Sequence, residues 1–133
     1  PFGRARIVAE GADITVVTNS MMTIKAEKAV RQLQKEGISA ELIDLRTIVP
    51  LDTETIIRSV KKTGKLLIVD EGHLSFGITG EIASRIMPDV FYDLDAPIQR
   101  MGTADVPLPF SPALEFPLIP DEKKIAAKIR EMV

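Results

Sequence analysis

The segment Lys65–His73, which reads KLLIVDEGH, decides the fold of this chain. Its apolar start, Leu66–Val69, predicts a strand that is buried on both faces of a sheet. The glycine-containing turn Phe76–Gly80 follows and opens into a helical pattern over Glu81–Met87. In an open α/β sheet, ligands and partners usually meet the fold where such a strand ends. The turn Asp70–Gly80 is therefore the first candidate for a functional site.

Strand-like and helix-like segments alternate on both sides of this turn, which predicts an α/β domain. The β-branched run Ile14–Thr18 and the segment Ile38–Thr47 predict two further strands, and Ile98–Met101 predicts a short edge strand. Residues Met22–Glu36 carry apolar side chains at helical spacing. The N-terminal Pro1–Val8 shows no such periodicity, and we expect it to precede the first packed element.

Capping residues set the expected ends of the helices. Gly37 is placed to end the first helix, Asp52 is placed to cap the second, and Gly64 is placed to end it. Pro88 predicts the end of the third helix, or a kink in it. Asp121 is placed to cap a final helix.

Five of the nine prolines fall between Val106 and Pro120. Because proline neither donates to a sheet nor continues a helix, residues 105–120 are predicted as an extended surface strap without helix. The helix that follows carries an apolar stripe up to the last residue, so we expect that end to dock rather than fray. The stripe consists of Ile125, Ile129, Met132 and Val133.

Composition favours one globular domain and argues against several classes of function. The 133 residues are 45% hydrophobic and 27% charged, which suits a single domain with its own core. A net charge of −2 and a pI near 5.5 argue against a nucleic-acid partner. The absence of cysteine excludes disulfides and thiolate ligands and fits a cytoplasmic protein. The apolar runs are too short to span a bilayer, so no membrane partner is expected.

Few residues suggest chemistry of their own. The only histidine, His73, is a candidate general base, although an exposed loop histidine is the commoner arrangement. The adjacent carboxylates Asp70 and Glu71 are a candidate acid/base couple, although a polar pair at the end of a strand is the commoner arrangement. No set of residues has metal-ligand spacing. Lys61 and Lys62 are expected in solvent at the end of a helix, where positive charge is favoured.

The glycines of the Asp70–Gly80 turn leave a second interpretation open. Backbone N–H groups at a helix start suit an anion, although the spacing here matches neither the dinucleotide nor the nucleoside-triphosphate fingerprint. The alternative to a domain without a site of its own is therefore an autonomous, flavodoxin-like module that binds a small anion at this turn.

Several segments, taken together and in order, resemble one family. They are Gly3–Val8 (GRARIV), Gly37–Asp52 (GISAELIDLRTIVPLD), Ser59–Gly64 (SVKKTG), Leu94–Pro97 (LDAP) and Asp105–Pro109 (DVPLP). They look like the C-terminal, transketolase C-terminal-like domain of the β subunit of thiamine-diphosphate-dependent 2-oxo acid dehydrogenases, which act on pyruvate, branched-chain 2-oxo acids or acetoin. The resemblance implies a three-layer α/β sandwich whose mainly parallel five-stranded sheet has one antiparallel edge strand and helices on both faces. Residues 1–133 would be a single domain of a longer β subunit.

The resemblance also implies that the catalytic centre lies outside this chain. In the family, the diphosphate of the cofactor and its metal ion, Mg²⁺, are held by the α subunit, and a preceding domain of the β subunit supplies a glutamate that activates thiamine diphosphate and a histidine near the substrate. We therefore expect no catalytic, cofactor-binding or metal-binding residue in this domain, and no activity from it alone. The parent reaction would be oxidative decarboxylation or cleavage of a 2-oxo acid or acetoin, with acyl transfer to lipoyl-lysine. The equivalent domain of transketolase, deoxyxylulose-phosphate synthase or a pyruvate oxidoreductase is the alternative relative.

Assembly and docking are the roles that the resemblance leaves for the domain. It implies a contact with a second β subunit and with the α subunit in an α₂β₂ heterotetramer, and a dock for the peripheral subunit-binding domain of the acyltransferase core. The predicted partner-binding residues are Asp95, Met132 and Val133. Because the docking module of the family is basic, an acidic contact at Asp95 makes electrostatic sense.

Overall fold

A computed structural model describes all 133 residues and contains one five-stranded sheet with the strand order β1-β3-β2-β4-β5. Strands β2 to β5 run parallel to one another, and β1 is antiparallel to β3 at one edge. The strands are β1 (Arg6–Ala9), β2 (Ile14–Thr18), β3 (Ala40–Asp44), β4 (Leu66–His73) and β5 (Gln99–Thr103).

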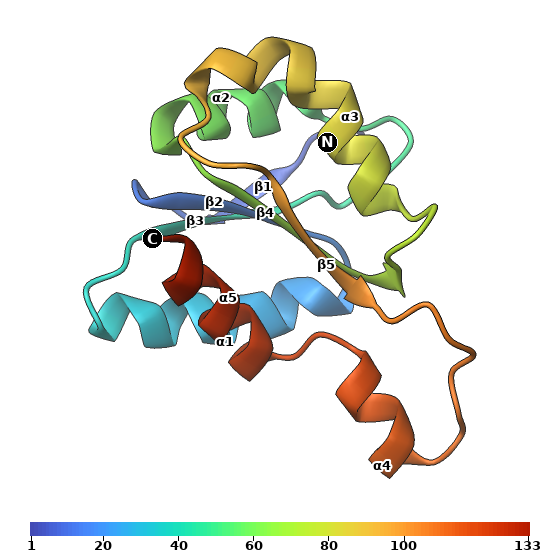
Figure 1. Cartoon of the computed structure of the whole chain (residues 1–133). Helices are drawn as coiled ribbons and strands as arrows, with labels where there is room; N and C mark the ends of the chain where they lie inside the picture. The colour runs from blue at the N-terminus through green and yellow to red at the C-terminus, as the bar shows by residue number, and fades with distance from the viewer.

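Helices cover both faces of the sheet, as Figure 1 shows. Helices α1 (Met21–Lys35) and α5 (Glu122–Met132) lie on one face, and α2 (Thr53–Thr63) and α3 (Ile78–Val90) lie on the other. This arrangement confirms the predicted three-layer α/β sandwich with one antiparallel edge strand. Three short helices complete the chain: η1 (Phe91–Asp93), α4 (Pro112–Glu115) and η2 (Phe116–Leu118).

The sheet separates two hydrophobic cores. Alternation along β2 places Val16 in the core under α1 and α5 and Val17 in the core under α2 and α3. All the buried hydrophobic residues are aliphatic or methionine, and none is aromatic. The apolar interior is therefore filled by aliphatic side chains and one methionine, Met22.

The predicted helix caps are confirmed. The carboxylate of Asp52 accepts a hydrogen bond of 3.1 Å from the Thr55 N–H, and that of Asp121 accepts one of 2.8 Å from the Lys124 N–H. Helix α2 ends at Gly64, whose φ of 76° is the left-handed conformation that favours glycine.

Two predictions about the ends of elements are wrong. The N-terminal segment is a packed element, because Arg6–Ala9 forms β1; its four residues are half-exposed at an edge, so no clear alternation marks them. Of the two alternatives at Pro88, the end of the helix is wrong, because helix α3 continues through Pro88 to Val90. Pro88 and Ser84, whose carbonyl loses its helical partner, both lie on the exposed side of α3, where water can replace the missing bond.

The strap of residues 105–120 is not wholly extended. It contains α4 and η2, so the expectation that it forms no helix is wrong between Pro112 and Leu118. Pro112 occupies the first helical position, where a backbone N–H is not needed. Strand β4 is longer than Leu66–Val69, and the residues expected in a turn, Asp70 to His73, belong to it.

Candidate functional site

The three candidates for acid–base chemistry do not converge. The His73 side chain is exposed, and its Nε2 lies 3.0 Å from the Val106 carbonyl oxygen. The Asp70 carboxylate accepts a 3.0 Å hydrogen bond from the Gly72 N–H, and the Glu71 side chain is exposed. No group of three or more His, Cys, Asp or Glu side chains is placed to hold a metal ion. The turn therefore holds no recognisable catalytic set.

The same turn is tied to the strap. The Asp105 carboxylate accepts hydrogen bonds from the Ser75 backbone N–H at 3.1 Å and from the Ser75 hydroxyl at 2.5 Å. These bonds, and to a smaller extent the nearby His73, lower the pKa of Asp105. Arg100 donates hydrogen bonds to the Leu74 carbonyl oxygen and to the Thr79 hydroxyl. The polar groups of this turn thus bind one another, which does not favour the anion-binding alternative.

Asp95 lies at the other end of β5, against the end of α2. Its backbone N–H donates a 2.8 Å hydrogen bond to the Gly64 carbonyl oxygen, and a Cβ at Gly64 would collide with its carboxylate. The side chain is exposed and forms no ion pair. A negative charge at the C-terminal end of a helix is unfavourable by itself, and the last turn of α2 carries the cations Lys61 and Lys62.

Met132 and Val133 lie on the opposite face of the sheet from Asp95. Met132 packs against the core under α1 and α5, and Val133 is 43% exposed at the end of α5. Leu94, next to Asp95, packs against the core under α2 and α3. Figure 1 shows the C-terminus and the loop before β5 on the same side of the molecule, at the edge where the parallel strands begin. The predicted residues Asp95, Met132 and Val133 thus lie at the same end of the sheet, but Asp95 is separated from the other two because it lies on the opposite face.

All six aromatic side chains of the chain are exposed. Five phenylalanines and one tyrosine are present, and their exposed fractions run from 61% for Phe91 to 108% for Phe76. Phe91 and Tyr92 pack edge to face, with ring centroids 5.2 Å apart. Aromatic side chains are the residues that most often anchor protein interfaces. The aromatic residues are Phe2, Phe76, Phe91, Tyr92, Phe110 and Phe116.

An apolar groove runs beside the edge strand β5. It has a volume of about 610 Å³, lies between α3 and the loop that precedes β5, and has six hydrophobic lining residues. Met87 and Phe91 also line a second hollow next to it on α3. The charged residues of the groove are Asp95 and Arg100. We call this feature the β5 groove; its lining is Ala83, Met87, Phe91, Leu94, Asp95, Ala96, Pro97, Ile98 and Arg100.

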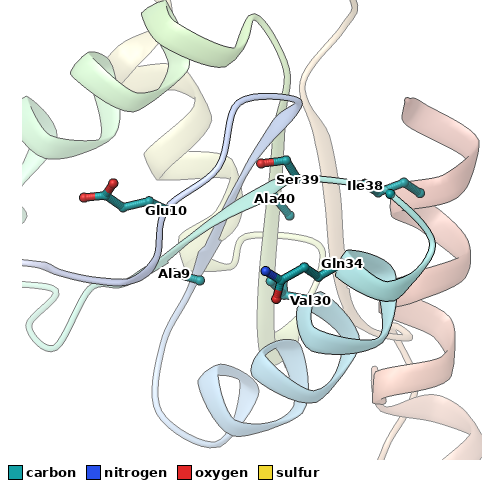
Figure 2. Close-up of a pocket in the computed structure, with 8 residues that line it drawn as sticks. Ala9, Glu10, Val30, Gln34, Ile38, Ser39 and Ala40 are labelled. Atoms are coloured by element: carbon teal, nitrogen blue, oxygen red, sulfur yellow. The ribbon is translucent and has the colours of Figure 1, made fainter.

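A smaller hollow of about 370 Å³ lies between the end of β1, the end of α1 and the start of β3, and Figure 2 shows it. Its polar side chains come from Glu10, Gln34 and Ser39. The Glu10 carboxylate points away from Gln34 in Figure 2, so these groups do not gather around one point. The hollow therefore offers no converging set of polar groups.

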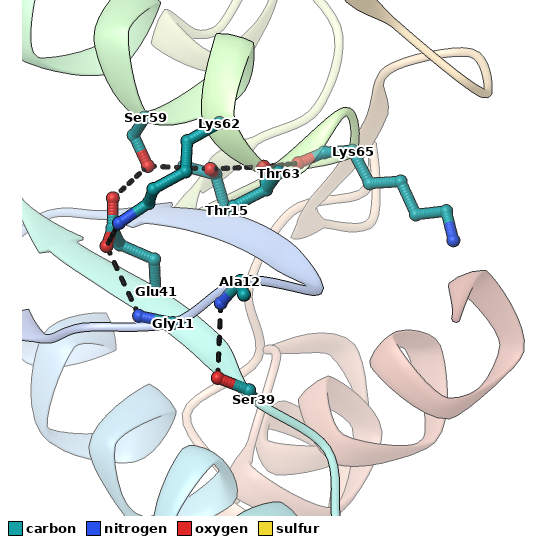
Figure 3. Close-up of polar contacts among 9 residues, drawn as sticks. All are labelled: Gly11, Ala12, Thr15, Ser39, Glu41, Ser59, Lys62, Thr63 and Lys65. Carbon is teal, nitrogen blue, oxygen red and sulfur yellow. Dashed lines mark hydrogen bonds and ion pairs between the residues drawn. The ribbon is translucent and has the colours of Figure 1, made fainter.

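A buried polar cluster lies under α2, and sequence reasoning missed it. Figure 3 shows the Glu41 carboxylate, 1% exposed, paired with Lys62 and accepting hydrogen bonds from the Ser59 hydroxyl at 2.5 Å and the Gly11 N–H at 3.2 Å. The Thr15 hydroxyl lies 2.7 Å from Ser59. Since the Ser59 hydroxyl donates its single hydrogen to the Glu41 carboxylate, the Thr15 hydroxyl must donate to the Ser59 oxygen. We call Thr15, Glu41, Ser59, Lys62 and Thr63 the Glu41 cluster.

The Glu41 cluster corrects the expectation that Lys62 only borders solvent. Burial raises the pKa of Glu41, but the hydrogen bonds from Lys62 and Ser59 outweigh it, and the net shift is downward. Every buried side-chain nitrogen or oxygen of the domain has a partner. The one sequence signal for this cluster was the charge of Glu41 between the apolar residues Ala40 and Leu42 of a buried strand.

The strand order and the helices on both faces define a three-layer α/β domain with one antiparallel edge strand. The chain belongs to the transketolase C-terminal domain family, whose model, described as "Transketolase, C-terminal domain", matches residues 3–125. No helix of the domain has both the length and the apolar character that crossing a bilayer requires.

Its relatives include β subunits of several dehydrogenases. The chain is 46% identical over 132 residues to the pyruvate dehydrogenase E1 component subunit beta of Rickettsia felis, covering 99% of this chain and 40% of the relative. It is 42% identical over 131 residues to the acetoin:2,6-dichlorophenolindophenol oxidoreductase subunit beta of Cupriavidus necator, covering 98% of this chain and 39% of the relative. The 2-oxoisovalerate dehydrogenase subunit beta of Bacillus subtilis is 41% identical over 133 residues, with 99% and 41% coverage.

A solved structure shares the fold. A split-gene transketolase, described as an inactive β4 tetramer, superposes with a TM-score of 0.79 at 27% identity and covers 98% of this chain and 41% of that chain. The chain thus spans about 40% of the length of the curated relatives it matches.

Proposed function

We propose that this domain is the assembly and partner-docking domain of the decarboxylase β subunit of a 2-oxo acid or acetoin dehydrogenase complex. The observation that carries the proposal is that every aromatic side chain lies on the surface while the core is aliphatic. Exposed aromatic residues at this density suit a domain whose surface is completed by other polypeptides. The relatives are named as β subunits, and we infer from these names that the domain belongs to an assembly of several kinds of subunit.

The parent enzyme would use thiamine diphosphate and Mg²⁺, and this domain would bind neither. A diphosphate with its metal ion needs several converging oxygen ligands, and the residues present here do not fit that need. The three carboxyl groups with shifted pKa values, Glu41, Asp52 and Asp105, are all shifted downward and are all occupied by partners within the domain. The proposal therefore places oxidative decarboxylation and acyl transfer to lipoyl-lysine on other parts of a cytoplasmic complex.

The proposed partners are a second β subunit, the α subunit and the acyltransferase core. We assign Asp95, Met132 and Val133 to docking of the peripheral subunit-binding domain. An exposed carboxylate without an ion pair at the end of α2, and a chain end that is partly exposed at the same edge, support this assignment. A basic docking module would satisfy the charge of Asp95.

Isothermal titration of the isolated docking module into the complete α₂β₂ enzyme tests the assignment. Asp95→Asn keeps the turn but removes the charge, and it is expected to weaken binding by about tenfold, as for a charge at an interface. Asp89→Asn, on the exposed side of α3, is the matched control and should leave the affinity unchanged. Equal affinities for both variants would reject the role of Asp95.

Titration of the 133-residue chain with thiamine diphosphate and Mg²⁺ tests the cofactor statement. We expect no heat of binding. Micromolar affinity would contradict a domain that serves assembly alone.

A further inference from the structure

Arg100, which lines the β5 groove, is a fixed cation without a counter-ion. Its Nη1 donates a 3.1 Å hydrogen bond to the Leu74 carbonyl oxygen and a 3.3 Å hydrogen bond to the Thr79 hydroxyl. The N–H groups on Nε and Nη2 make no hydrogen bond within the chain, and no carboxylate pairs with Arg100. Two of the five guanidinium donors therefore hold the side chain in place, and the other three have no partner.

The unused donors of Arg100 are of the kind that binds a carboxylate. Neighbouring N–H groups of a guanidinium form a planar fork that can donate to both oxygens of a carboxylate at once. Because the Nη1 bonds already fix the guanidinium, little side-chain freedom remains to be lost when such a ligand binds. Arg100 is therefore a preorganised recognition group for an anion at the wall of a groove.

The groove extends from Arg100 as an apolar channel along α3. Arg100 contacts the first turn of α3. Ala83, Met87 and Phe91 follow at four-residue spacing, so they lie in a row on one side of the helix. The row is about 12 Å long, since a helix rises about 1.5 Å per residue. The loop Leu94–Ile98 forms the facing wall, so the groove is a channel with a cation at one end.

The walls of the groove favour a hydrocarbon chain over a peptide. A peptide would bring backbone N–H and C=O groups that need partners. The facing loop offers few of them, because Pro97 has no N–H and the Asp95 N–H already donates to the Gly64 carbonyl oxygen. An alkyl chain has no polar group to satisfy and can lie against the apolar row.

We propose that the β5 groove binds a small amphipathic carboxylate of the fatty-acid class, with its carboxylate on Arg100 and its alkyl chain along Ala83, Met87 and Phe91. The groove volume of about 610 Å³ lies within the roughly 300–1,000 Å³ of small-molecule sites. Asp95, the one anion of the lining, forms no ion pair with Arg100 and so does not compete for the cation.

This site differs from the anion-binding alternative at the turn Asp70–Gly80, because it uses a side chain and an apolar groove rather than backbone N–H groups. The inference goes beyond the proposed function and does not depend on it.

Isothermal titration of the 133-residue chain with octanoate tests the proposal. We expect one site with a dissociation constant in the high micromolar to millimolar range, as for a ligand with few atoms. Octan-1-ol lacks the charge, and propionate lacks most of the alkyl chain. Each should bind at least about tenfold more weakly than octanoate.

Substitutions separate the cation from the channel. Arg100→Gln should weaken octanoate binding by about tenfold, and Arg100→Lys, which keeps the charge without the fork, should have an intermediate effect. Arg58→Gln removes an exposed arginine of α2 that has no ion pair and lies outside the groove, so it is the matched control. Because Arg100 also holds Leu74, a second variant is needed. Met87, which packs against neither core, can be changed to Glu to repel the ligand without disturbing the fold.

Methionine methyl resonances locate the ligand. The chain has five methionines, and Met87 is the only one that lines the groove. In a chain labelled at its methionine methyl groups, octanoate should shift the Met87 resonance. Met21, which is 49% exposed on α1 at the opposite face, reports unspecific contact and should not shift.

Absence of octanoate binding would overturn the inference, as would equal affinity for octanoate and octan-1-ol. Equal weakening by Arg100→Gln and Arg58→Gln, full affinity in Met87→Glu, or a shift at Met21 as large as that at Met87 would also overturn it. None of these results touches the proposed function, which is tested separately by titration of the docking module into the complete enzyme.

Discussion

The Glu41 cluster has polar groups where apolar ones are usual, in the interior, and the strap has apolar groups where polar ones are usual, on the surface. The cluster buries a carboxylate and three hydroxyl groups under α2, whereas the strap exposes two phenylalanines and two leucines. In the cluster, every polar atom finds its partner within the chain. In the strap, no residue between Pro107 and Phe116 bonds to the rest of the domain.

This difference separates what holds the domain together from what remains for a partner. Buried polar groups contribute specificity only when all of them are satisfied, so the Glu41 cluster belongs to the stability of the single chain. Exposed apolar groups contribute nothing to that stability until another surface covers them. Mutations in the first region should therefore change folding, and mutations in the second should change association.

The largest effect is expected from Lys62→Met. It removes the cation from a carboxylate that is 1% exposed, and it should lower the free energy of unfolding by about 2–3 kcal/mol, somewhat less than for a fully buried pair because Lys62 is partly exposed. Urea unfolding gives the value. Lys61→Met, at the exposed neighbouring position, is the control and should stay within about 0.5 kcal/mol of the unmodified chain. Equal losses in both variants would show that the pair does not stabilise the fold.

The second prediction is that acid lowers the stability of the fold by protonating buried carboxylates, among them Glu41 and Asp52. The folded-state pKa values of Glu41 and Asp52 lie below their ordinary values of 4.5 and 3.8. A lowered pKa means that the stabilisation is complete above the unfolded-state value and is lost as the pH falls through the folded-state value. Stability should be level near neutral pH and should fall below about pH 4.5.

Glu41→Gln should make this acid dependence less steep, because it removes one of the three carboxyl groups whose pKa is lowered in the folded state. Glu54→Gln, in solvent on the first turn of α2, is the control and should keep the slope of the unmodified chain. Urea midpoints measured from neutral pH down to acid would decide the matter, and identical slopes for both variants would contradict the role of Glu41.

Asp52→Ala should have a smaller effect. Besides capping α2, Asp52 accepts a 2.9 Å hydrogen bond from the Ala5 N–H and so ties the segment before β1 to the helix. We expect a loss of about 1–2 kcal/mol, against about 1 kcal/mol for Asp121→Ala, which removes a cap alone. Thermal unfolding of both variants tests the order, and a greater loss at Asp121 would reverse it.

The smallest effect on folding is expected from the exposed phenylalanines. Phe110→Ser and Phe76→Ser should each change the unfolding free energy by no more than about 0.5 kcal/mol when measured on the monomer. A buried phenylalanine would cost about 3–5 kcal/mol on truncation. A loss of that size at Phe110 would mean that the strap packs on its own domain, and the contrast between the two regions would disappear.

The sequence predicted most of the architecture. The caps Asp52 and Asp121, the stop at Gly64 and the buried strands around Ile14–Thr18 and Leu66–Val69 follow from local propensity and periodicity, and the structure confirms them. Strand β1 could not be found this way, because a short edge strand is defined by pairing to β3 rather than by its own pattern. The sequence could not exclude a helix end at Pro88, because tolerance of proline within the helix depends on which side of α3 faces solvent.

In the candidate site too, the sequence indicated individual residues, whereas their positions and contacts depend on the tertiary structure. The motif around Asp95 marked the residue, but only the fold places it at the end of α2, on the other face of the sheet from Met132. Lys62 looked like one of several solvated lysines, and its pairing with Glu41 depends on the packing of α2 over β3. Contacts between residues far apart in the chain carry no local signal.

What the sequence by itself determined is the class of fold, the position of most elements and the absence of a local catalytic motif, since these depend on neighbours within a few residues. What only the tertiary structure decided is which polar groups satisfy one another inside, and that every aromatic ring lies outside. The physical reason is that burial and pairing are properties of the packed sheet and helices, which bring together residues such as Gly11, Glu41 and Lys62 from three separate segments.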